Sequence, residues 1–420
     1  MTTAIVTPEK PAAPPPPPRK LRMFSALGYR DFRLLWAGAL VSTTGTWMQT
    51  VAQAWLVLSM TGSAFLLGVD GFLATLPMIL FSLLGGVAAD RFDRRKMLLV
   101  SQFCQLTLAF VLAGLIFFER VQVWQIFILS FLTGSAQSIG GPAYQALLPQ
   151  LVKREDVPNA IAMNSIQFNL ARVFGPVMAG LALAAFGAAF CFVLNGLSFF
   201  AVIVSLLLIR SRMVPEREAR KGVFVEMREG LRFMRERSAL MQLSFFAFVS
   251  AFFGIPIVTL LPVVAKDTLS LDARGYSWIL TAYGAGSVLG ALLVAATGNR
   301  PRKGALAIVF QILFSIFLFI FATSRSFPVS LISIFFAGAS LIGVIAMVSS
   351  LVQLASSENM RGRVVSMFML AFRGGMPLGN LAAGFIAQRY SVTIALALNA
   401  VVLAMFGISF LIRPTAIRQL

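Results

Sequence analysis

The chain has 420 residues, of which 58% are hydrophobic and 12% are charged, and its formal net charge is +19. It contains no histidine, so the commonest proton carrier and metal ligand among the side chains is missing. This excludes a Ser-His-Asp hydrolase, and no cluster of residues suggests a metal site or a bound cofactor. Long apolar runs are typical of a membrane protein with several spans, and we expect no enzymatic activity.

The first 23 residues contain five consecutive prolines, Pro14–Pro18. Consecutive prolines favour an extended polyproline conformer, and this segment has no apolar stretch that could serve as a signal peptide. We therefore predict that residues 1–23 form a disordered cytoplasmic tail ahead of the first membrane helix.

The apolar runs predict twelve membrane-spanning helices. A helix needs about 20 residues to cross the hydrocarbon, so the longest runs, such as 34–69, hold two helices or most of two. Breaks such as Thr61-Gly62 and Pro142 divide them. The predicted helices span residues 34–58, 65–89, 97–117, 122–143, 160–185, 188–209, 239–263, 275–297, 304–323, 328–349, 364–387 and 391–412. The predicted fold class is an all-α integral membrane protein.

Positive charge lies mainly on one side of these helices. With the N-terminus in the cytoplasm, 28 of the 35 Lys and Arg residues fall in the terminal arms and the cytoplasmic loops. The positive-inside rule then places both termini in the cytoplasm. The basic excess faces anionic lipid, so we expect a membrane-lipid partner and no nucleic acid.

The first helix carries a polar stripe. Four hydrogen-bonding side chains follow one another at spacings of four, three and four: Ser42, Thr46, Gln49 and Gln53. Such groups are costly in lipid, so this face should look into a cavity or onto a neighbouring helix. Trp47 and Trp55 form an adjacent stripe, for which stacking on a substrate and plain helix packing both remain open.

Carboxylates that could carry protons are scarce. Asp70 is the only acid inside a predicted helix, about five residues from the outer end of helix 65–89. It is either a hydrated carboxylate at the outer rim or a proton acceptor. Asp31 begins the first helix, where capping of the helix or pairing with Arg33 competes with a role in proton coupling.

The stretch "GVAADRFDRR", residues 86–95, resembles the signature between helices 2 and 3 of the major facilitator superfamily. The residues that match are Gly86, Asp90, Arg91, Arg94 and Arg95, whereas Asp93 stands where the family usually has glycine. The resemblance implies that Asp90 faces the N-terminus of the eleventh predicted helix, 364–387, and holds an outward-open state. It also implies that Gly86 permits close helix approach. An ordinary positive-inside loop is the alternative.

One arginine lies deep in the fifth helix. Arg172 is the only charged residue from 157 to 209, roughly 18 Å into the helix at 1.5 Å per residue, and Pro176 follows four residues later. Arg373 and Pro377 repeat this pattern in the second half. Arginine does not readily lose its proton, so two hypotheses stand. The pair either gives positive potential to a cavity for anionic or catechol-like substrates, or it binds carbonyls freed by the prolines.

A basic segment divides six helices from six. We predict bundles at 24–209 and 239–413, a cytoplasmic linker at 210–238 and a cytoplasmic tail at 414–420. The paired Arg-x-x-x-Pro stretches favour two pseudo-symmetric halves with a substrate site between them. In the linker, apolar residues at spacings of three, four and three predict a helix along the cytoplasmic membrane face: Phe224, Met227, Leu231 and Met234.

Further stretches resemble the bacterial exporter branch of this superfamily, which includes enterobactin and macrolide exporters: "YRDFRLLWAG" (29–38), "GTWMQTVAQAWLV" (45–57), "PAYQALLPQLVKREDVPNAIAMNS" (142–165) and "FNLARVFGPVMAG" (168–180). The resemblance implies proton-driven export of a small molecule across a bacterial inner membrane. "GPVMAG", with Gly175, Pro176 and Gly180, resembles the antiporter signature of helix 5. It implies packing against the eighth predicted helix, 275–297, on a face of small residues: Gly284, Gly286 and Gly290.

We therefore expect a monomeric secondary active transporter that exports a siderophore, drug or similar amphiphile by alternating access. Proton motive force is the expected driving force. The predicted substrate cavity comprises Gln49, Gln53, Trp47, Asn169, Arg172, Arg373 and Asn380. Asp70 and Asp31 are the candidates for proton coupling. A lipid or lysolipid flippase or scramblase and a non-transporting membrane sensor are the competing classes.

Overall fold

The N-terminal half is a bundle of six membrane-spanning segments. The computed structural model describes residues 24–210, 223–298, 302–358, 360–412 and 417. The helices of this half are α1 (Arg30–Thr61), α2 (Ala64–Arg91), α3 (Arg94–Phe117), α4 (Val123–Leu147) and α5 (Val157–Leu208). Gly187, at φ 79°, breaks α5 into two spans. A left-handed backbone suits glycine, so the chain reverses here without a separate loop.

The C-terminal half repeats this plan. Its helices are α7 (Ser238–Gly254), α8 (Pro256–Val263), α9 (Ala273–Thr297), α10 (Lys303–Thr323), α11 (Phe327–Ala355), α12 (Arg361–Arg389) and α13 (Val392–Ile412). A single π turn, Val264–Thr268, extends α7 and α8 into one span. In the described residues eight helical segments are long and apolar enough to cross a membrane. The two spans of α5, and the more polar α1, α4 and α12, bring the total to the predicted twelve.

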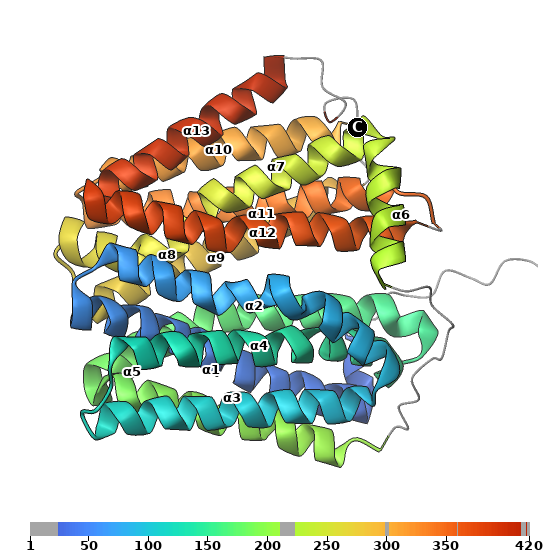
Figure 1. Cartoon of the computed structure of the whole chain (residues 1–420), viewed down its shortest axis with the longest axis horizontal. Coiled ribbons are helices and arrows are strands. Elements are labelled where there is room, and N and C mark those ends of the chain that lie inside the picture. The colour runs from blue at the N-terminus through green and yellow to red at the C-terminus, as the bar shows by residue number, and fades with distance from the viewer. Residues whose placement is uncertain (1–23, 211–222, 299–301, 359, 413–416, 418–420) are drawn as a thin grey trace, which may run out of the picture.

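The two halves lie side by side with their helices roughly parallel (Figure 1). The end of the molecule that holds α6 (Val223–Arg235) is called the linker end, and the other is called the far end. At the far end α1 finishes at Thr61, α2 starts at Ala64 and α12 finishes at Arg389.

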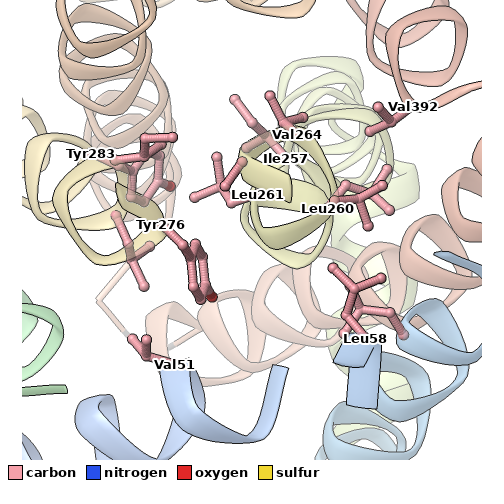
Figure 2. Packing of buried hydrophobic residues seen from close by; sticks show 14 of the residues in the cluster. Val51, Leu58, Ile257, Leu260, Leu261, Val264, Tyr276, Tyr283 and Val392 are labelled. Atoms are coloured by element: carbon pink, nitrogen blue, oxygen red, sulfur yellow. The ribbon is translucent and has the colours of Figure 1, made fainter. Parts of the chain in front are cut away.

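A shared apolar core joins the halves toward the far end. Val51 and Leu58 of α1 belong to the same buried cluster as Leu261 of α8 and Tyr276 of α9. Figure 2 shows these side chains gathered around α8, with α1 below them. Because burying a large apolar side chain is worth about 1.5–3 kcal/mol, this core stabilises the closed arrangement of the far end.

The linker helix packs on the C-terminal half. Met234 is buried among residues of α7, α11 and α12, and the Arg363 Nη1 to Glu229 Oε2 distance is 2.6 Å. The prediction that this apolar face lies on the membrane is therefore wrong for Met234. The physical reason for this difference is that apolar residues of α7, α11 and α12 bury Met234 inside the protein. The side chain of Phe224 lies outside the described side chains.

Candidate functional site

The halves meet closely at the far end, along two seams. In the first, between α2 and α12, the Ser63 hydroxyl donates to Gln388 Oε1 at 2.9 Å, and Gly68 packs against the Asn380 backbone. A Cβ atom on Gly68 would lie 2.6 Å from the Asn380 carbonyl oxygen. A glycine is therefore required for α2 and α12 to approach this closely.

The second seam joins α5 to α9. A Cβ on Gly180 would lie 2.7 Å from the Cβ of Ser277, and one on Gly284 would lie 2.8 Å from the Arg172 carbonyl oxygen. Trp55 of α1 also stacks on Tyr276 of α9 with ring centroids 6.0 Å apart. These contacts close the path between the halves at the far end.

A cavity of about 480 Å³ is lined mainly by α1, α3, α4 and α5 of the N-terminal half, and Val258 of α8 in the other half also lines it. It extends from Gln145 and Asn164, near the linker end, to Thr50 and Gln105 farther in. Amide side chains from three helices line it: Gln102, Gln105, Gln137, Gln145, Asn164 and Gln167. None of its lining residues is charged. Such walls bind groups that both donate and accept hydrogen bonds.

A buried carboxylate lies farther along the same half. Asp70 is 7% exposed, and its Oδ2 atom accepts from Gln53 Nε2 of α1 at 2.9 Å. Its Oδ1 atom accepts from the Ser130 hydroxyl of α4 at 2.5 Å. Asp70 is thus sealed between three helices and does not lie at a hydrated rim. The next residue, Gly71, packs against Asn380, so the carboxylate adjoins the α2–α12 seam.

Arg172 rests on aromatic rings. Its guanidinium carbon lies 5.4 Å from the centre of the Trp47 ring and 5.2 Å from that of Phe168. Both rings line the cavity. Among the described contacts, no hydrogen bond joins Arg172 to a carbonyl freed by Pro176, and its Nε atom is buried without a partner. Cation–π attraction, worth about 2 kcal/mol when desolvated, holds the side chain beside the cavity.

Comparison with known families decides the identity of this arrangement. The model of the family described as "Transmembrane secretion effector" matches residues 22–417. The chain belongs to this family. It is therefore a secondary transporter of the major facilitator superfamily. Its twelve spans in two halves fit the fold of that superfamily.

Several relatives of the chain are named as efflux proteins. The macrolide efflux protein A of Streptococcus pyogenes is 24% identical over 370 residues, covering 86% of this chain and 90% of the relative. The multidrug efflux pump Tap of Mycolicibacterium fortuitum is 27% identical over 84% of this chain and 88% of its own length. A D-xylose-proton symporter structure, 15% identical, superposes with a TM-score of 0.73 over 94% of this chain and all of that one. This last likeness shows the fold.

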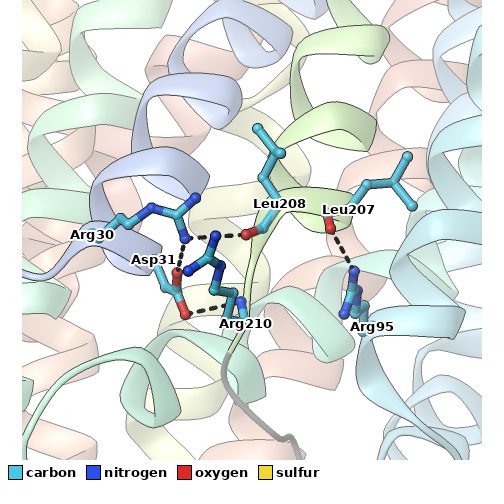
Figure 3. A network of polar contacts seen from close by, with 6 residues as sticks. All are labelled: Arg30, Asp31, Arg95, Leu207, Leu208 and Arg210. Atoms are coloured by element: carbon cyan, nitrogen blue, oxygen red, sulfur yellow. Dashed lines mark hydrogen bonds and ion pairs between the residues drawn. The ribbon is translucent and has the colours of Figure 1, made fainter.

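The signature of this superfamily between α2 and α3 ties helix ends together at the linker end. Arg94 Nη1 donates to the Ala146 carbonyl at 3.3 Å, and Arg95 Nη2 donates to Leu207 at 3.0 Å, as Figure 3 shows for Arg95. Asp93, the departure from the usual glycine, caps α3 by accepting from the backbone N–H of Arg95 at 2.8 Å. Cations near helix C-termini are favourable, so both arginines stabilise the bundle.

Two expectations about this signature have different outcomes. A Cβ on Gly86 would meet nothing within 4 Å, so the prediction that Gly86 permits close approach is wrong. The neighbouring Gly85 packs against the Ser138 backbone of α4 instead. The side chains of Asp90 and Arg91 lie outside the described ones, so the contact of Asp90 with α12 stays a prediction.

The helix 5 signature serves two interfaces. Gly175 packs against Trp47 and Thr44 of α1, within the half, whereas Gly180 faces α9. On α9, Gly284 faces α5 as expected. Gly286 and Gly290 pack against Phe335 and Ala339 of α11, so the prediction that they receive α5 is wrong. The α9 helix has small residues on two faces because it is wedged between α5 and α11.

The predicted cavity residues occupy several places. Trp47 lines the amide-walled cavity together with Ser42 and Thr46 of the polar stripe. Gln49 accepts from Asn195 Nδ2 at 2.5 Å, and Gln53 binds Asp70. These two glutamines join helices within the N-terminal half and do not face the cavity.

The remaining predicted residues lie on or near the seams. Asn380 is 3% exposed and its Oδ1 accepts from Thr259 at 3.0 Å, beside Gly71. Arg373 is half-buried on α12. Asn169 lies in a largely apolar cleft of about 420 Å³ between α5 and α9.

Asp31 lies at the linker end in a polar network. Arg30 Nη1 lies 3.2 Å from Asp31 Oδ1, and the Arg210 backbone N–H donates to Asp31 Oδ2 at 3.2 Å (Figure 3). Its described ion pair is with Arg30, whereas Arg33 donates to the Leu27 carbonyl. The network fastens the start of α1 to the end of α5.

Sequence reasoning missed the amides of α3 and α4 that wall the cavity. Gln102 and Gln105 on α3, and Gln137 on α4, lie within the predicted spans 97–117 and 122–143, and Gln145 lies just past the second of these. A count of amide groups inside apolar runs could have found them, because such groups are costly in lipid.

Proposed function

We propose that this transporter exports a small amphiphile from the bacterial cytoplasm in exchange for protons, with Asp70 as the proton-carrying group. One observation carries the proposal: among the described residues, Asp70 is the only buried carboxylate, and it adjoins the seam between the halves. A carboxylate is costly to bury without a charged partner, which gives it a reason to take up a proton.

The distribution of charge supports the direction of transport. Lys and Arg cluster at the linker end, so the positive-inside rule favours a cytoplasmic linker end and cytoplasmic termini in an inner membrane. The amide-walled cavity then begins on the cytoplasmic side while the far end is closed. This arrangement suits a state that accepts substrate from the cytoplasm, and because both halves are in one chain we propose a monomer.

The cavity walls and the relatives support an amphiphilic substrate. Amide groups of α3, α4 and α5 line the cavity together with the rings of Trp47 and Phe168, and the Arg172 guanidinium lies over these rings. A substrate with hydrogen-bonding groups and an apolar face fits this combination. Proton motive force supplies the energy, and the proposal requires no bound cofactor.

Asp70→Asn tests the role of protons. Purified protein is reconstituted in proteoliposomes with erythromycin and ethidium as probes, and transport is driven by an imposed pH difference. We expect transport against a gradient in the wild type and its loss with an uncoupler. Asp70→Asn should lose the dependence on the pH difference while facilitated exchange of probe persists.

Asp31→Asn is the matched control, since Asp31 lies in the network at the linker end. Wild-type behaviour of Asp70→Asn under the imposed pH difference would overturn the proposed proton site. If no probe is moved at all by the wild type, the export proposal itself fails for this substrate class.

A lysolipid flippase is the second candidate, favoured by the cleft between α5 and α9. Apolar residues from both helices line it, and Phe174 and Leu292 are more than half exposed there, at membrane depth. An acyl chain could enter such a cleft from the bilayer. Fluorescent lysophosphatidylethanolamine, followed by albumin extraction from proteoliposomes, tests this. Acceleration over empty liposomes supports it, and an unchanged rate excludes it.

A further inference from the structure

The Ser130 hydroxyl occupies the centre of the polar cluster around Asp70. Its oxygen lies 2.5 Å from Asp70 Oδ1, 2.9 Å from the Ile126 carbonyl oxygen and 2.8 Å from Gln53 Nε2. A hydroxyl has one hydrogen to donate and two lone pairs that accept. Ser130 therefore cannot donate to Asp70 and to Ile126 at once, although it is placed for both.

With Asp70 ionised, every group finds a partner. The Ser130 hydroxyl donates to Asp70 Oδ1, and one amide hydrogen of Gln53 reaches Oδ2 at 2.9 Å. The other amide hydrogen of Gln53 goes to the Ser130 oxygen. The separation of 2.5 Å lies at the short end of the range of about 2.5–2.7 Å for a hydroxyl that donates to a charged oxygen.

With Asp70 protonated, the same heavy atoms still satisfy one another. A hydronium ion of the aqueous phase gives its proton to Oδ1 and leaves water, and the new O–H group donates to the Ser130 oxygen. The Ser130 hydroxyl then turns to the Ile126 carbonyl at 2.9 Å, and Gln53 keeps its contact with Oδ2. Rotation of one hydroxyl hydrogen converts one pattern into the other. Neither state leaves a buried polar group unpaired, which otherwise costs about 1–3 kcal/mol.

The charged groups on neighbouring helices lie far along their axes. The elements packed against α2 include α1, α3, α4, α8 and α12. The charged residues of α3 are Arg94, Arg95 and Lys96, in its first turn at the linker end. Neither α4 nor α8 carries Lys, Arg, Asp or Glu, and those of α1 lie in its first turn at the linker end. On α12, Arg373 and Arg389 are seven and nine residues from Asn380, which is roughly 10 and 14 Å of helix. The described partners of the Asp70 carboxyl are therefore Gln53 and Ser130.

We propose that Ser130 is a positioning residue for proton exchange, whose hydroxyl reverses its direction as Asp70 gains and loses a proton. The inference rests on the proposed proton-coupled function and adds to it the group that makes both charge states stable in one packing arrangement. Proton loading then requires no movement of α2 or α4. The free energy of protonating Asp70 is then not used to move α2 or α4 and can favour rearrangement of the adjacent α2–α12 seam.

The carbonyl stretch of a protonated carboxyl group tests this in the absence of any substrate. Full-length protein in proteoliposomes is titrated with pH while infrared difference spectra are recorded, and Asp70→Asn identifies the band. We expect the wild-type band to titrate in one step with little change in the amide bands. Ser130→Ala should change by about tenfold the proton concentration at which half of the Asp70 carboxyl groups are protonated. The reason is that the ionised and protonated states lose hydrogen bonds of unequal strength.

Two further variants separate this role from plain packing. Ser130→Thr keeps the hydroxyl and should restore the wild-type titration. Ser135→Ala, on the same helix, removes a hydroxyl that donates to the Phe131 carbonyl at 2.8 Å, and should titrate like the wild type. In the Asp70→Asn background, Ser130→Ala should have no further effect on the spectra.

The outcomes distinguish the two proposals. A band that depends on Asp70 but titrates identically in Ser130→Ala overturns the role of Ser130 and leaves the proton site intact. If no titrating band depends on Asp70, the proposed proton site fails and the role of Ser130 fails with it. A Ser130→Thr protein that behaves like Ser130→Ala would show that packing, and not the hydroxyl, matters.

Discussion

The two seams that close the far end hold equivalent positions but are packed differently. Between α2 and α12, glycines face backbone: a Cβ on Gly384 would lie 2.9 Å from the Ala64 carbonyl oxygen and 3.0 Å from the Gly68 Cα atom. Between α5 and α9, Gly284 also faces backbone, with the Arg172 carbonyl oxygen at 2.8 Å, but Gly180 faces the Cβ and Oγ atoms of Ser277. A substitution can remove the Ser277 side chain but not a backbone carbonyl, so an added methyl group can be relieved at Gly180 and not at Gly384.

The neighbours of the seams differ as well. Asp70 adjoins the α2–α12 seam through Gly71, whereas Arg172 and its aromatic rings adjoin the α5–α9 seam through Gly284. This division suggests that protons act on one seam and substrate on the other. Alternating access would then need both seams to open together. Through this shared rearrangement, proton binding at one site could change the free energy of substrate binding at the other.

Gly384→Ala should give the largest effect. The added Cβ meets backbone on α2, and overpacking of this kind costs about 1–3 kcal/mol, or roughly five- to 150-fold in the population of the closed far end. We expect transport to fall by about tenfold or more. Spin labels at the exposed positions Phe117 and Tyr390 should report a longer distance across the far end.

Gly374→Ala is the matched control, since a Cβ at this position on the same helix meets nothing within 4 Å. It should transport like the wild type. A Gly384→Ala protein with a wild-type distance distribution would show that the seam does not depend on close backbone packing.

The polar stripe of α1 shows what the sequence could predict. Spacing located one face of the helix correctly, and Ser42 and Thr46 do line the cavity. Farther along the stripe, Gln49 and Gln53 bond to Asn195 and Asp70. Periodicity identifies a face that must avoid lipid, but the partner depends on helices that are distant in sequence.

The glycines teach the same lesson. The helix count and the two halves followed from apolar runs and charge, because membrane thickness and charge placement are local constraints. Which glycine permits contact was not local: Gly85 serves where Gly86 was expected, and Gly290 faces α11 instead of α5. A rotation of about 100° per residue moves such a contact to another helix.

Arg172→Met tests the substrate side of the comparison and should have an intermediate effect. Loss of the cation–π contacts is offset by removal of the buried Nε atom that has no partner, so an apolar side chain of similar length should leave the thermal stability about unchanged. If the cation serves anionic substrates, their transport should fall by roughly tenfold, the value of a hydrogen bond to a charged group. A fluorescent anion and ethidium, compared in the same vesicles, provide the measurement.

Arg172→Lys is the companion variant, since it keeps the charge but loses the planar group that lies against Trp47 and Phe168. A clear loss of thermal stability in Arg172→Met, with unchanged selectivity between the two probes, would assign the arginine to the structure and not to the substrate.

Gly180→Ala should have the smallest effect of the three, and it tests the central difference between the seams. Its Cβ would meet the Ser277 side chain, which can be shortened. We expect transport to fall by only a few-fold, because the cost of overpacking here should be near its lower limit of about 1 kcal/mol. Ser277→Gly in the same chain should restore transport. No equivalent rescue exists for Gly384→Ala, because its obstacle is the Ala64 carbonyl. If Ser277→Gly fails to rescue Gly180→Ala, the Ser277 side chain does not limit this contact, and the proposed difference between the Gly180 and Gly384 contacts is refuted.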